Sequence, residues 1–125
     1  MSYTIKNLSE VDDVAPRFGF DSVQEARFAW RDLGAQDTGL AYHVLKPGKR
    51  GSAHRHDAAE EIYVVLAGSG RINLDGEVVE LRPLDAVRVA PHVTRAFEGG
   101  PEGLQILAFG PHHEGDGEIL KEDVW

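Results

Sequence analysis

The sequence predicts a single all-β domain of the jelly-roll type, because its apolar residues fall in short strand-like runs that are separated by turns. The chain has 125 residues, the usual length of one domain, and can bury most of its apolar surface without disulfides. Apart from a possible helical turn at 7–14, no long window has the apolar spacing of an amphipathic helix. No internal repeat is present. We therefore expect one core that is enclosed mainly by strands.

The first strands are expected on either side of a glycine. Residues 26–31 alternate in character as on a half-buried strand, and we expect the aromatic side chains among them to belong to the core. Gly34 would end this strand. The run 38–45 predicts a second strand, which Lys46-Pro47-Gly48 closes because proline cannot donate a ladder hydrogen bond.

Further strands are expected in the second half of the chain, at 62–66, 71–74, 77–81, 85–89, 93–98 and 104–109. Asp75-Gly76 supplies the positive φ angles of a type I′ turn, and therefore predicts a hairpin between two of these strands. Gly68-Ser69-Gly70 predicts another turn. Short strands at this spacing, without helices between them, favour antiparallel pairing in a small barrel.

The chain is expected to divide into three parts. Residues 1–37 form an N-terminal segment with a strand that packs on the barrel, and residues 38–110 form the barrel itself. Residues 111–125 form a polar, glycine-rich tail with few groups to bury. We expect this tail to be mobile unless its few apolar residues dock.

Charge and composition disfavour several classes of partner. A formal net charge of −8 argues against nucleic acid and anionic membrane surfaces, which attract clustered lysine and arginine. No apolar run approaches the ~18–20 residues that span a bilayer, and residues 1–10 lack the pattern of a signal peptide, so we expect a cytoplasmic protein. Cysteine is absent, so a metal would have to use histidine or carboxylate ligands. A small molecule is the expected partner.

Two histidines and a glutamate form the strongest candidate for a metal site. His54 and His56 are two residues apart, so on an extended chain both imidazoles point to the same face. Glu61, at the start of the next strand, can complete a set of two histidines and one carboxylate that leaves coordination positions open. The same residues are also compatible with a solvated loop that binds no metal.

The three candidate ligands belong to a longer pattern. Gly48, His54, His56, Glu61 and Gly68 match every fixed position of the first motif of the cupin family, G-x5-H-x-H-x4-E-x6-G. The sequence therefore resembles the cupins. That resemblance implies a cupin jelly-roll barrel (a double-stranded β-helix), often dimeric, and a divalent transition metal such as Fe, Mn, Ni or Zn.

The second cupin motif is present only in degraded form. Pro83-Leu84-Asp85 resembles the P-G-D turn of the family, with leucine in place of glycine. Arg95 stands where family members usually carry a third histidine ligand. Arginine has no lone pair to give, and at ~6 Å and an effective dielectric of about 20 it would repel a divalent ion by roughly 5–6 kcal/mol. Arg95 shares its parity with Phe97, so we expect its side chain to point into the pocket.

Three interpretations of the pocket stay open. The first is a metal-dependent enzyme of the oxygenase, isomerase or lyase type, in which Arg95 and Tyr63 bind a small anionic organic substrate. In the second, no metal binds, and His54, His56 and Arg95 form a cationic cup in a non-catalytic ligand-binding or sensory protein. The third is an inert barrel in which Arg95 pairs with Glu61. We favour the first interpretation, with His54, His56 and Glu61 as metal ligands, and we expect a homodimer.

The other histidines carry weaker predictions. His92 could replace the missing third ligand, although exposure on a loop is the favoured interpretation. His43 is expected to be a structural histidine with satisfied hydrogen bonds, and His112 and His113 are expected at the surface. No nucleophile elbow, phosphate-binding glycine loop or dinucleotide fingerprint is present, so hydrolase, nucleotidase and nicotinamide-enzyme functions have no support.

Overall fold

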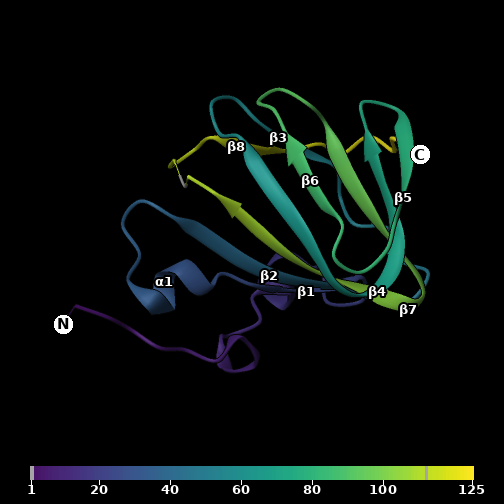
Figure 1. Ribbon diagram of the computed structural model, residues 1–125. Coiled ribbons are helices and arrows are strands. Elements are labelled where there is room, and N and C mark those ends of the chain that lie inside the picture. The colour runs from purple at the N-terminus through teal and green to yellow at the C-terminus, as the bar shows by residue number, and fades with distance from the viewer. Residues whose placement is uncertain (1, 112) are drawn as a thin grey trace.

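Two long antiparallel strands, β4 (Glu61–Leu74) and β7 (Arg95–Gly110), form the centre of the fold (Figure 1). The computed structural model describes residues 2–111 and 113–125. On its other side β7 pairs along its second half with β2 (Gly39–Leu45), and β2 pairs with β1 (Gln24–Arg27). β1 therefore extends the sheet beyond β2.

The remaining strands of the described chain are shorter and curl the sheet into a barrel-like shape. β5 (Glu77–Leu81) and β6 (Ala86–Val89) both pair with β4. β3 (His54–His56) pairs with β7 at one position and with β8 (Gly117–Ile119) along its whole length. Every pairing is antiparallel. The predicted all-β class is thus confirmed.

The core lies on the inner face of the curled sheet, to which both β4 and β7 contribute. Val65 and Ile72 from β4, and Leu104 and Ile106 from β7, are each at most 1% exposed. Side chains of alternating positions on a strand point to the same face, so Leu104 and Ile106 share the inward face of β7. Tyr63 belongs to the same buried cluster, so the core packs directly beside the residues of the candidate site.

The first predicted strand is wrong beyond residue 27. β1 ends at Arg27, and Ala29–Leu33 form a short α-helix, α1. Gly34 adopts φ 68° and its N–H bonds the carbonyls of Trp30 and Arg31, so this glycine caps a helix rather than ending a strand. A run of six residues that alternate in character is too short to distinguish a strand from one turn of helix.

Two 3-10 turns precede β1, at Leu8–Glu10 and Ala15–Phe18. None of the helices described is long or apolar enough to cross a membrane.

The turn predicted at Gly68-Ser69-Gly70 is also wrong, because β4 continues through it. Gly68 has φ 79°, and a Cβ built on it would lie 2.1 Å from the carbonyl oxygen of Gly103 on β7. The register of β4 against β7 shifts at this point. The glycines therefore allow two backbones to approach closely at an irregularity of the sheet, a role that sequence alone does not distinguish from a turn.

The predicted hairpin at Asp75-Gly76 is confirmed. Asp75 has φ 51° and Gly76 has φ 95°, and the Gly76 N–H donates to Oδ1 of Asn73 at 2.8 Å. Both central residues have the positive φ that a type I′ turn requires, and the turn joins β4 to β5.

The C-terminal segment is docked on the barrel. Its strand β8 adds to β3, and the Leu120 N–H donates to the carbonyl oxygen of Ala53 at 2.8 Å. Farther along, Asn73 Nδ2 donates to the Val124 carbonyl at 2.9 Å, and Arg50 lies over the Trp125 ring. The polar tail therefore contributes to the structure around β3.

Candidate metal centre

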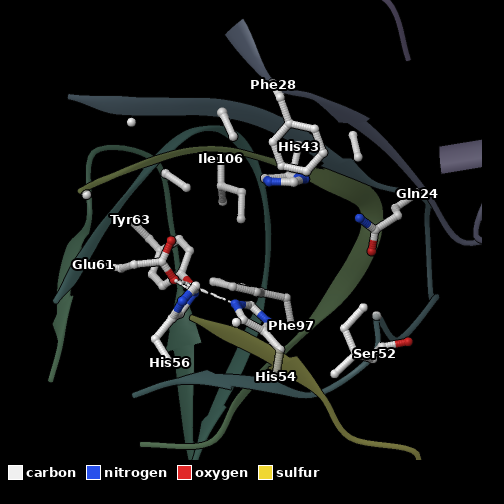
Figure 2. A pocket seen from close by; sticks show the side chains of 18 of the residues that line it. Gln24, Phe28, His43, Ser52, His54, His56, Glu61, Tyr63, Phe97 and Ile106 are labelled. Carbon is white, nitrogen blue, oxygen red and sulfur yellow. Dashed lines mark hydrogen bonds and ion pairs between the residues drawn. The ribbon is translucent and has the colours of Figure 1, made fainter. Parts of the chain in front are cut away.

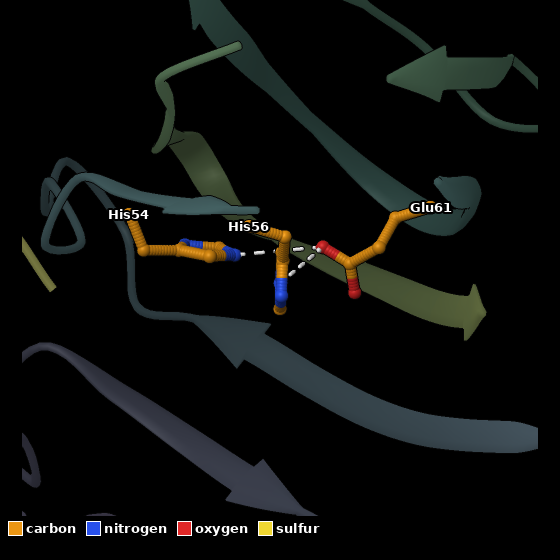
Figure 3. Close-up of side chains that lie close together, drawn as sticks. All are labelled: His54, His56 and Glu61. Carbon is orange, nitrogen blue, oxygen red and sulfur yellow. Dashed lines mark ion pairs between the residues drawn. The ribbon is translucent and has the colours of Figure 1, made fainter. Parts of the chain in front are cut away.

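The side chains of the three predicted ligands, which come from β3 and from the start of β4, converge on one point (Figure 3). His54 and His56 lie on the same face of β3, and Glu61 is the first residue of β4. The Nε2 atoms of His54 and His56 lie 3.5 Å and 3.1 Å from Oε1 of Glu61, and one ligand atom from each residue lies within 4.8 Å of the others. Two atoms that each lie about 2.1 Å from one tetrahedral ion are about 3.4 Å apart, so this donor set fits a divalent transition metal.

Tyr63 fixes the carboxylate of Glu61. The two residues share a face of β4, and the Tyr63 hydroxyl donates to Glu61 Oε1 at 2.5 Å. The same hydroxyl lies 3.4 Å from His54 Nε2. Burial raises the pKa of Tyr63 well above its usual value, and the charge of Glu61 raises it further, so the phenol stays protonated and acts as a donor.

The charges of the cluster depend on one another. Burial alone would raise the pKa of Glu61, but hydrogen bonds with His54, His56 and Tyr63 outweigh burial and hold it well below its usual value. The hydrogen bond with Glu61 raises the pKa of His56 against the opposing effect of burial. A proton and a metal therefore compete for Nε2 of His56.

Asp116 is a member of the site that the sequence analysis missed. Its Oδ2 atom lies 3.1 Å from Nδ1 of His56, on the opposite side of the ring from Glu61. Its carboxylate also accepts the backbone N–H groups of Ala58 and Ala59 at 2.7 Å and 3.1 Å. Sixty positions separate Asp116 from His56, and the one signal for it in the sequence is an acidic residue between two glycines.

Arg95 is buried behind the cluster. Its side chain is 0% exposed, and Nη2 lies 3.8 Å from Oε1 of Glu61. In the described parts of the chain its guanidinium nitrogens have no hydrogen-bond partner. Arg95 points inward, as its parity with Phe97 predicted, but it does not line the cavity beside the ligands. The role of Arg95 in substrate binding stays a prediction, and its burial favours an action through Glu61.

The ligands form part of the wall of a cavity of about 430 Å³ (Figure 2). This volume is within the roughly 300–1,000 Å³ that is typical of small-molecule sites. Phe28, Trp30, Phe97 and Ile106 contribute apolar surface to the wall, and Tyr63 lines it beside the ligands. The arrangement places the convergent ligand groups in a chamber whose wall is mostly apolar, as is typical of a site for an organic molecule.

The remaining histidines lie outside the cluster. His92 is exposed, with φ 73°, and its backbone N–H donates to the carbonyl of His56 at 2.7 Å. His113 is exposed at the rim of the cavity, and the prediction for His112 falls outside the described residues. His43 lines the cavity beside Phe28, but its Nδ1 has no hydrogen-bond partner in the part of the chain that the structure describes. The expectation that His43 has satisfied hydrogen bonds is therefore wrong at Nδ1.

Comparison with known proteins identifies the family. A sequence model of the cupin domain matches residues 41–108. The chain belongs to the cupin family. This cupin has the jelly-roll fold that its first motif implied, and the matched region contains the three candidate ligands.

Two curated relatives and one solved structure illustrate what this cupin is similar to. An uncharacterized protein of Methanocaldococcus jannaschii is 33% identical over 85 residues, which cover 66% of this chain and 68% of that protein. The polyketide synthase CurC of Streptomyces cyaneus is 24% identical over 102 residues, 74% of this chain and 66% of that one. The polyketide cyclase RemF from Streptomyces resistomycificus has a TM-score of 0.79 at 19% identity, covering 96% of this chain and 87% of its own. At this identity the likeness to RemF shows the fold alone.

Proposed function

We propose that this cupin is a metal-dependent enzyme that acts on a carbonyl-containing organic molecule with extensive apolar surface. The observation that carries the proposal is the convergence of His54, His56 and Glu61 in the wall of an apolar cavity. Fe, Mn, Ni and Zn all suit two imidazoles and one carboxylate. When bound, such a metal supplies Lewis-acid charge that polarises a substrate oxygen.

The protein itself would orient the substrate and exclude water. The aromatic wall formed by Phe28, Trp30 and Phe97 suits flat, unsaturated molecules, because aromatic faces stack on conjugated systems. Tyr63 holds one oxygen of Glu61, so the carboxylate keeps a single orientation when substrate enters. A chamber with few polar groups also strengthens any electrostatic interaction inside it.

Within this class we propose a ring-closing condensation between two carbonyl groups of one molecule. An enolisable carbon attacks a second carbonyl carbon and a ring C–C bond forms; the attacking carbon then loses two hydrogens in total, which leave with the former carbonyl oxygen as water, and the new bond becomes a C=C double bond. The reaction needs no oxidant or reductant. The sequence similarity to CurC, whose name describes a polyketide synthase, supports this choice, and RemF, which is named a polyketide cyclase, shares the fold. The enolate form of such a substrate is an anion, in keeping with the anionic molecule expected from the sequence.

Metal analysis tests the proposal first. Untagged wild-type protein, loaded with each of the four metals and desalted, should retain one of them near one equivalent, as measured by inductively coupled plasma mass spectrometry. His54→Ala should lose that metal. His92→Ala, which removes an exposed histidine outside the cluster, should retain it.

Substrate chemistry tests the second part. Acetylacetone, a small β-diketone, should bind the metal-loaded protein and fail to bind the stripped protein or His54→Ala. A linear diketone that can close to a cyclohexenone should cyclise faster with loaded wild type than with His54→Ala. Wild type that retains none of the metals, but binds simple carboxylates, would instead support the non-catalytic anion-binding alternative.

Assembly and location form a separate part of the proposal. We expect a homodimer, and the exposure of Tyr3 and Ile5 in the N-terminal segment supports the presence of surface that a second copy can cover. Light scattering at working concentration should give twice the mass of one chain, and a monomer mass would contradict the expectation. A cytoplasmic location remains a prediction from the sequence.

A further inference from the structure

We propose that Asp116 positions His56 for metal binding, so that the docked C-terminal segment is part of the metal centre. This inference rests on the proposed metal site at His54, His56 and Glu61. It concerns a residue that lies far from the cupin motif in the sequence and reaches the site only through the pairing of β8 with β3.

The carboxylate of Asp116 is held in one place by three contacts. Oδ1 accepts the N–H of Ala58 at 2.7 Å, and Oδ2 accepts the N–H of Ala59 at 3.1 Å. Oδ2 also lies 3.1 Å from His56 Nδ1, and the Asp116 side chain is only 7% exposed. A carboxylate fixed by two backbone donors offers His56 a stationary acceptor.

The contact keeps a hydrogen on Nδ1 of His56, because an ionised carboxylate can only accept hydrogen bonds. Nε2 faces Glu61 Oε1 at 3.1 Å and donates its own hydrogen there, so Nε2 is the nitrogen from which a metal would displace a proton. A ligand histidine whose other nitrogen donates to a carboxylate is oriented and made more basic, typically with 10–100-fold effects on metal affinity.

His54 lacks an equivalent support. Within the described residues its Nδ1 has no hydrogen-bond partner, and its side chain is 30% exposed, against 21% for His56. The two imidazoles are therefore unequal: His56 is fixed by the C-terminal segment, whereas His54 is held by strand geometry and by its contacts with Glu61 and Tyr63.

The same contacts couple the metal site to docking of the segment. The Asp57 N–H donates to the Asp116 carbonyl at 3.2 Å, and β8 continues with His56 opposite Gly117. An ion that requires His56 in this orientation therefore favours the docked segment, and the docked segment favours the ion by the same free energy. Gly117 and Ile119 also line the cavity, so docking completes its wall.

Two matched substitutions test the inference. Asp116→Asn keeps the shape of the side chain but replaces one acceptor oxygen with an NH₂ group, which cannot accept from His56 or from the backbone N–H groups. Its Zn²⁺ affinity, measured by competition with a chelator, should be 10–100-fold weaker than that of wild type. Glu118→Gln alters the same segment at an exposed residue that pairs with Arg55, and should leave Zn²⁺ affinity unchanged. ¹⁵N NMR of the imidazole should show a hydrogen on Nδ1 of His56 in metal-free wild type and a smaller population with a hydrogen on Nδ1 in Asp116→Asn.

Each outcome is decisive. Wild type that binds none of Fe, Mn, Ni and Zn would defeat the proposed function, while the NMR signal of Nδ1 would still report on Asp116. Wild type that binds Zn²⁺ with the same affinity and the same Nδ1 signal as Asp116→Asn would overturn the inference alone. Should Asp116→Asn fail to fold, hydrogen exchange of wild type decides instead: the amides of 117–119 should be better protected with Zn²⁺ than without, and equal protection would overturn the coupling.

Discussion

The buried guanidinium of Arg95 lies with Nη2 3.8 Å from Oε1 of Glu61, and the resemblance to the cupin motif led us to expect a third histidine at this position. The pair places a fixed positive charge directly behind a candidate metal ligand. That charge partly neutralises Glu61, and it opposes the entry of a divalent cation. We therefore expect Arg95 to lower the affinity of this site for a divalent ion.

Replacing Arg95 with histidine should tighten divalent metal binding. Arg95→His removes a charge that repels the ion by several kcal/mol at an effective dielectric of about 20, and it adds a nitrogen that can ligate. We expect at least about tenfold higher affinity in titration calorimetry, the equivalent of about 1.4 kcal/mol. Arg95→Met should give a smaller gain, because it removes the charge without adding a ligand.

Arg88→Met is the matched control for this series. Arg88 carries the same charge but is exposed and pairs with Glu60 at 2.8 Å, so its loss should leave metal affinity unchanged. Equal or weaker affinity in both Arg95 variants would show that Arg95 does not act on the metal site.

Removing the Tyr63 hydroxyl should destabilise the protein. Tyr63→Phe leaves Glu61 without the donor at 2.5 Å, and a hydrogen bond to a charged group typically contributes about 1.5–3 kcal/mol. Urea unfolding in the presence of a chelator should show a loss of that size. Tyr42→Phe, which removes a neutral hydrogen bond to Gln105 at 2.8 Å, should cost only about 0.5–1.5 kcal/mol. Equal losses in the two variants would contradict the charge-assisted role of Tyr63.

His43 should make the protein less stable as the pH falls. Burial and the charge of His54 lower its pKa to about 4, against 6.5 for the unperturbed group, so the unfolded chain binds this proton first. The free energy of unfolding should therefore decline as pH falls from about 6.5 toward 4, by up to about 3 kcal/mol from this group. His43→Gln should flatten that part of the stability curve, while His113→Gln at the exposed rim should not. Identical curves for wild type and His43→Gln would show that His43 titrates normally.

Gly68 should tolerate no side chain. A Cβ there would lie 2.1 Å from the Gly103 carbonyl oxygen, and φ 79° is strained for any other residue. Gly68→Ala should cost about 3 kcal/mol or more, from strain together with displacement of β7. Gly48→Ala is the control: its φ of 69° is similar, but nothing lies within 4 Å of the added atom, so about 1 kcal/mol is expected. Comparable losses in denaturation would rule out the close approach as the reason for glycine at 68.

The sequence by itself determined the fold class and three members of the site. Both predictions rest on local patterns: the alternation within strands, the Asp75-Gly76 turn, and the spacing of His54, His56 and Glu61. Such patterns fix which side chains share a face of a strand, whatever the strand pairs with. The same reasoning placed Arg95 inside the barrel, because parity along a strand fixes which face a side chain joins.

Only the tertiary structure decided the structural roles of two glycines. It also decided which residues distant in the sequence join the site. Gly34 caps a helix and Gly68 permits a close approach of β4 to β7, but each allows a positive φ that would equally suit a turn. Asp116 contacts His56 only because β8 pairs with β3. These strands lie far apart in the sequence, and no local spacing of residues predicts their pairing. The sequence thus specifies which side chains can share a face, whereas strand pairing decides which faces meet.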